Sequence, residues 1–69
     1  MTAAAHHDPD AGALEAVRTG LEQLMERIVD IADARRVDPD EPLVSDLDEL
    51  ERSLKVALRR LDRILRRVA

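Results

Sequence analysis

The side chains best suited to bind a metal lie at the start of the chain. His6 and His7 precede Asp8 and Asp10, and imidazole and carboxylate groups together can hold a divalent cation. No neighbouring pattern fixes the geometry of these groups, so we predict a flexible N-terminal tail and no metal site.

Residues that could act as nucleophiles are few and have no base beside them. Ser45, Ser53, Thr2 and Thr19 lack a histidine at helical spacing, and the chain has no cysteine and no glycine-rich phosphate loop. A catalytic site needs a nucleophile or acid–base group positioned by a second group. We therefore expect a protein that is not an enzyme, with no catalytic residues and no cofactor.

The composition describes a small protein with an aliphatic core. The 69 residues include no Phe, Tyr or Trp, yet 45% are hydrophobic and 38% are charged. A core of this size contributes only about 3–5 kcal/mol unless oligomerisation or a ligand adds to it. The opening residues do not resemble a signal peptide, so we expect a cytoplasmic protein. Ten of the eleven basic residues are arginine, a bias that suggests a small bacterial protein.

Apolar residues recur at the heptad positions a and d in two segments, which predicts two amphipathic helices. We expect a tail over 1–8 and a helical hairpin over 9–69, with a first helix at about 9–36, a loop at 37–44 and a second helix at about 45–68. Asp8 and Ser45 are the predicted N-terminal caps, and Pro39 and Pro42 interrupt the helical pattern. The apolar a and d residues are Leu14, Val17, Leu21, Leu24, Ile28 and Ile31, then Leu43, Leu47, Leu50, Leu54, Ala57, Leu61, Ile64 and Val68.

This pattern predicts an all-α, antiparallel, coiled-coil-like hairpin closed by a continuous a/d seam. The e positions extend the apolar stripe along one flank of the hairpin, which we predict to be an association face for a second copy. The expected product is a homodimer that forms a four-helix bundle. The alternative is that these residues only widen the contact within one chain. The predicted association face consists of Met25, Ala32, Val44, Leu58 and Leu65.

Charge is distributed unevenly. Residues 1–51 carry four basic and fourteen acidic residues, whereas residues 52–69 carry seven basic residues and Asp62 alone as an acid. A basic face is predicted on the second helix, formed by Arg52, Lys55, Arg59, Arg63 and Arg66.

The function that these features favour is a non-catalytic protein–protein interaction or assembly module, a self-associating hairpin that acts as adaptor or regulator. Its partners would be a second copy and an unidentified protein, with no membrane. The alternatives are a nucleic-acid-associated regulator that uses the basic face, and an accessory subunit of a larger bacterial assembly. No motif in the sequence identifies a family.

Overall fold

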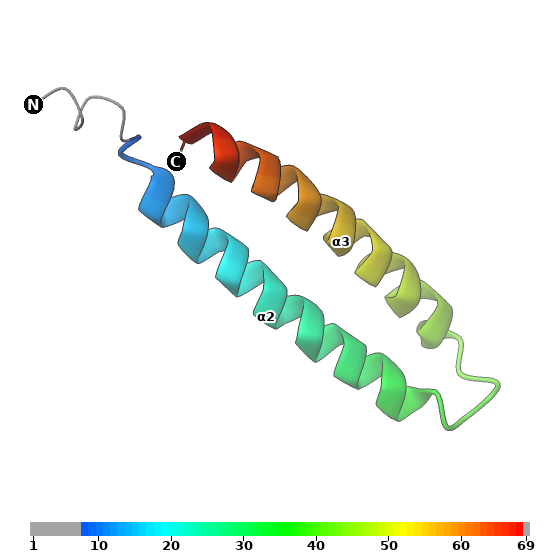
Figure 1. Ribbon diagram of the computed structural model, residues 1–69. Coiled ribbons are helices and arrows are strands. Elements are labelled where there is room, and N and C mark those ends of the chain that lie inside the picture. The colour runs from blue at the N-terminus through cyan, green and yellow to red at the C-terminus, as the bar shows by residue number, and fades with distance from the viewer. Residues whose placement is uncertain (1–7, 69) are drawn as a thin grey trace, which may run out of the picture.

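A computed structural model describes residues 8–68, which form two long helices (Figure 1). Helix α2 spans Ala11–Arg35 and helix α3 spans Leu43–Val68. The helices lie side by side and run in opposite directions, joined by a short loop (Figure 1). The predicted all-α antiparallel hairpin is therefore confirmed, and neither helix is long and apolar enough to cross a membrane. Residues 1–7 of the predicted tail over 1–8, with His6 and His7, lie outside the described residues.

Helix α2 begins at Ala11, two residues later than predicted, and its N-terminal cap position is held by Asp10, whose side chain makes no capping hydrogen bond, so the prediction of Asp8 as the cap is wrong. The Asp8 carboxylate accepts a hydrogen bond from the Asp10 amide at 2.8 Å, and the Asp8 carbonyl accepts one from the Ala11 amide. These bonds use amide groups that a helix start leaves unpaired. The helix ends at Arg35, and the Arg36 amide closes the last turn on the carbonyls of Ala32 and Asp33.

Helix α3 begins earlier than predicted. Ser45 is the third residue of this helix, so the prediction that it is the N-terminal cap is wrong. The Glu41 carboxylate instead accepts a hydrogen bond from the Leu43 amide at 3.2 Å. Pro42 directly precedes the helix, where its fixed φ angle and missing amide hydrogen are tolerated.

Few side chains are buried in this hairpin. Within the described residues, only Ala32, Leu58 and Leu61 are less than one-tenth exposed. Two helices in contact along one face have little interior, because each leaves most of its circumference to solvent. The fold therefore depends on a narrow line of contact, and its position on the two helices decides which side chains remain exposed.

Candidate functional site: an exposed apolar stripe

The contact between the helices is centred on positions a and e, and not on positions a and d. Of the predicted association face, Ala32 and Leu58 are 2% and 8% exposed, and Met25, Val44 and Leu65 are half-buried. The interpretation of these five residues as an exposed flank is thus wrong. They widen the contact within one chain, which was the alternative that the sequence left open.

Ion pairs between the helices accompany this rotation. The Arg18 Nε donates a hydrogen bond to the Asp62 carboxylate at 2.6 Å. Arg36 makes a two-pronged contact with Asp48, at 3.1 and 2.9 Å. Asp62 and Asp48 both occupy b positions. Around each helix, position b lies beside position e, on the side away from positions a and d. Turning each helix toward this side brings the paired charges within reach and displaces position d from the contact.

The same pairs shift the ionisation of their members. The hydrogen bond from Arg18 lowers the pKa of Asp62 below its ordinary value, and the hydrogen bond from Arg36 does the same for Asp48. The pKa of each guanidinium is raised in return, chiefly by its hydrogen bond to the carboxylate. Both carboxylates are therefore charged at neutral pH and bound to a partner, which suits a structural role better than proton transfer.

The displaced d positions form a line of exposed apolar side chains, which we call the d stripe. Each member is more than two-fifths exposed, and Val17, Leu24 and Ile31 are each at least half exposed. The described residues contain eight exposed large hydrophobic side chains, and six of them belong to this stripe. The d stripe consists of Val17, Leu24 and Ile31 of α2 with Leu43, Leu50 and Ile64 of α3.

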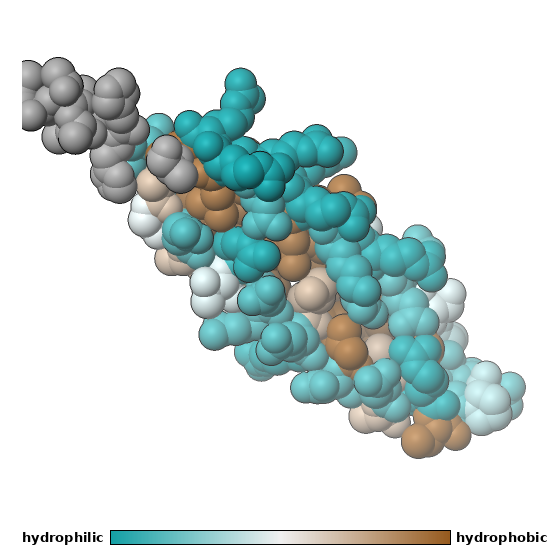
Figure 2. Space-filling view, viewed as in Figure 1, coloured by the Kyte–Doolittle hydropathy of each residue, from teal (hydrophilic) through white to brown (hydrophobic). Residues whose placement is uncertain are grey.

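The two halves of the d stripe lie on the same face of the hairpin. On each helix, position d is next to position a, on the side away from position e. Since α2 and α3 are antiparallel and meet at positions a and e, this side is the same for both. The hairpin thus has one apolar face and one face with ion pairs. The face in view in Figure 2 is mostly hydrophilic, with apolar side chains visible only in patches between the helices.

The predicted basic face is on the outside of α3, but part of it is neutralised. Arg52 pairs with Glu49, and Lys55 pairs with Glu51 at 3.1 Å. Arg59, Arg63 and Arg66 are exposed, and no ion pair with another of residues 8–68 is found for these three. The face therefore offers three cations on successive turns near the C-terminal end of α3.

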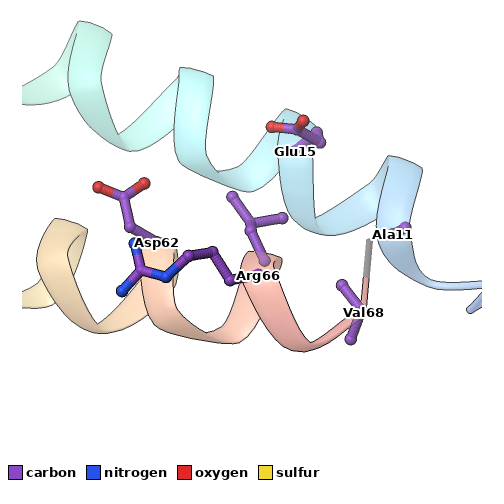
Figure 3. A pocket seen from close by; sticks show the side chains of 6 residues that line it. Ala11, Glu15, Asp62, Arg66 and Val68 are labelled. Atoms are coloured by element: carbon purple, nitrogen blue, oxygen red, sulfur yellow. The ribbon is translucent and has the colours of Figure 1, made fainter.

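A shallow pocket of about 300 Å³ lies at the open end of the hairpin (Figure 3). Asp62 extends from α3 toward α2, and Glu15 and Arg66 line the same pocket beside Ala11, Leu65 and Val68. Asp62 is already bound to Arg18. Among residues 8–68, no group of three His, Cys, Asp or Glu side chains is placed to hold a metal ion. The d stripe is therefore the strongest candidate site, and its chemistry is hydrophobic association.

The chain matches no protein-family model, no curated protein and no solved structure.

Proposed function

We propose that this protein is a non-catalytic interaction module that associates with itself through the d stripe and presents its outer faces to a larger protein partner. The observation that carries this proposal is the exposure of Val17, Leu24 and Ile31, together with Leu43, Leu50 and Ile64, on one face of the hairpin. Half-exposed side chains at a regular seven-residue spacing are typical of an interface that a second element covers.

The energetics of a small hairpin support the same conclusion. A single core in a chain of this size contributes only about 3–5 kcal/mol. Burying the exposed half of one leucine or isoleucine side chain adds roughly 1 kcal/mol. A second copy would bury most of the side chains of the d stripe from each hairpin, and would convert a two-helix unit with little interior into a four-helix bundle.

A pair of matched substitutions tests the proposal. Leu50 is 43% exposed and belongs to the d stripe, whereas Val56 is 39% exposed and lies on the outer side of the same helix. We expect Leu50→Glu to give a monomer by light scattering, because it would place an unpaired charge in the interface. Val56→Glu should leave the mass unchanged, at about twice the 7.7 kDa of one chain.

The outcome that contradicts self-association is a mass near 7.7 kDa for the unaltered chain at tens of micromolar, together with full helicity and cooperative unfolding. Equal masses for both glutamate variants, each at the dimer value, would instead show that the association uses another face.

Binding to nucleic acid is the second candidate function, supported by the exposed row of Arg59, Arg63 and Arg66. Phosphate contacts by three arginines would make the affinity for duplex DNA or RNA fall steeply with salt concentration. The net charge of −4 opposes this function. A titration of binding against salt separates the two candidates, because association through the d stripe is apolar and depends little on ionic strength.

The outer faces remain available in a dimer that forms through the d stripe. The outer side of α2 is mainly acidic and that of α3 mainly basic, and this asymmetry would orient a protein partner more than it would tighten binding. We propose on this basis that the dimer serves as an adaptor, regulator or accessory subunit of a larger assembly.

A further inference from the structure

We propose that two copies pack d stripe against d stripe with their loops at opposite ends of the bundle. This inference rests on the proposed self-association and specifies its geometry. It commits to one occupant of the apolar face, a second copy of this chain.

The size of the face fits a stable dimer. A helix of 25 residues is about 37 Å long, and two helices side by side are roughly 20 Å wide. Each copy therefore offers on the order of 700 Å² along this face, or roughly 1,400 Å² for two copies, which is the size of a standard specific interface.

The d stripe is self-complementary about its centre. The Arg18–Asp62 and Arg36–Asp48 pairs place Leu24 level with a residue between 56 and 60 of α3, a range that includes Ala57. Val17 and Ile31 lie seven residues to either side of Leu24, and Leu50 and Ile64 lie seven residues to either side of Ala57. A two-fold axis at this level, perpendicular to the helices, places each apolar layer of one copy against an apolar layer of the other.

The central layer combines large and small side chains. Two copies of Leu24 would meet there with two copies of Ala57, and Ala57 is the one small residue at a d position of α3. Alternation of large and small residues lets facing helices pack without a void or a clash. The outer layers would each hold Val17 and Ile64 of one copy with Ile31 and Leu50 of the other.

Two symmetric arrangements bring the apolar faces together, one with the two loops at the same end of the bundle and one with the loops at opposite ends. The distribution of charge favours the second arrangement. Residues 24–55, which include the loop, carry ten acidic and five basic residues, for a net charge of −5. Residues 8–23 and 56–68, at the open end, carry five acidic and six basic residues, for a net charge of +1. Loops at the same end would place two charges of −5 together. Loops at opposite ends place each −5 beside a +1, which lowers the repulsion.

The ends of α3 are complementary in the same arrangement. Asp46 follows the start of α3 and Arg67 precedes its end, both at g positions on the rim of the apolar face. With loops at opposite ends, the two α3 helices are antiparallel neighbours, and Asp46 of one copy lies beside Arg67 of the other. With loops at the same end, Asp46 would lie beside Ala34 and gain no opposite charge.

The distance between the two loops tests this arrangement. The natural chain has no cysteine, and Val37 in the loop is 86% exposed, so Val37→Cys accepts a nitroxide label with little perturbation. Pulsed electron–electron double resonance on the labelled dimer should give a distance of roughly 40 Å or more, set by the helix length. Loops at the same end would give about 20 Å, set by the spacing of adjacent helices.

A second labelled variant and the molecular mass make each result decisive. Val56→Cys lies near the middle of α3, so its two labels are separated by the width of the bundle and not by its length in either arrangement, and a dipolar signal from it serves as the control for labelling and association. A dimer mass with a long Val37 distance supports the inference. A dimer mass with a short Val37 distance overturns the inference and leaves the proposed self-association intact. A monomer mass with no dipolar modulation from either label overturns both.

Discussion

Replacing Leu58 by alanine tests where the two helices touch. Leu58 is 8% exposed within a single hairpin, and the substitution removes three carbon atoms. At about 0.8 kcal/mol for each buried CH₂ group, the transfer of these atoms accounts for roughly 2 kcal/mol. The cavity adds little, because most neighbouring side chains are half-exposed and can close around it. We expect Leu58→Ala to lower the free energy of unfolding by about 2–3 kcal/mol, at the low end of leucine-to-alanine substitutions.

The matched control is Leu50→Ala, which removes the same atoms from a side chain that is 43% exposed in the hairpin. Within one chain, Leu50→Ala should lower the free energy of unfolding by about 1 kcal/mol, since only half of this side chain is buried in the hairpin. Urea unfolding, followed by circular dichroism over a hundredfold range of protein concentration, measures both losses. Sucrose in every sample strengthens burial and keeps the transition of the weaker variant measurable.

The two variants should respond differently to dilution. The loss from Leu58→Ala should be the same at all concentrations, whereas the loss from Leu50→Ala should grow as association covers the d stripe. If Leu50→Ala costs as much as Leu58→Ala at the lowest concentration, the helices meet at positions a and d within one chain, and the assignment of faces is refuted.

Three further predictions concern a glycine, an ion pair and the basic face. Gly20 is in mid-helix with negative φ and open space around its Cα. Gly20→Ala should therefore stabilise the fold by about 0.5–1 kcal/mol in a thermal melt. A lower melting temperature would show that another chain approaches Gly20 closely. The pKa of Asp62 should be below 3.8 by NMR titration and should return toward that value in Arg18→Gln. Because this pKa is lowered in the folded state, the pair stabilises the hairpin above pH 3.8, and this stabilisation is lost as the pH falls through the folded-state pKa. In Asp62→Asn, the free energy of unfolding should therefore decrease less as the pH is lowered. Arg59→Glu with Arg66→Glu should leave the dimer mass intact and weaken binding of an acidic partner at low salt; dissociation of the dimer would show that association runs through charge.

The sequence was sufficient to predict the hairpin because the signals for it are local. Apolar heptad spacing and the two prolines of the loop depend on neighbouring residues, and the structure places both helices within two residues of the predicted bounds, with Asp10 and not Asp8 at the N-terminal cap position of α2. The start of α3 was missed at Ser45, because Glu41, which satisfies the Leu43 amide, precedes a proline and does not match a capping motif.

The faces of the hairpin could not be assigned from the sequence, because the apolar stripe covers positions a, d and e. Two helices can close such a stripe at a and d or at a and e, and the apolar pattern fits both. In the structure the contact at a and e is accompanied by Arg18–Asp62 and Arg36–Asp48, and these pairs join residues 44 and 12 positions apart. A signal was present for one pair, since Arg18 at an e position opposite Asp62 at a b position indicates an ion pair across the helices.

The d stripe as the contact between two copies is tested most directly by methyl NMR on a mixed sample. Chains with isotope-labelled methyl groups are combined with unlabelled chains, and a filtered experiment detects only methyl contacts between different copies. Contacts between copies should appear at Leu24, Leu50 and Ile64 and be absent at Leu58, which packs within its own hairpin. Contacts confined to Met25, Leu58 and Leu65, or no contact between copies at millimolar concentration, would contradict the account.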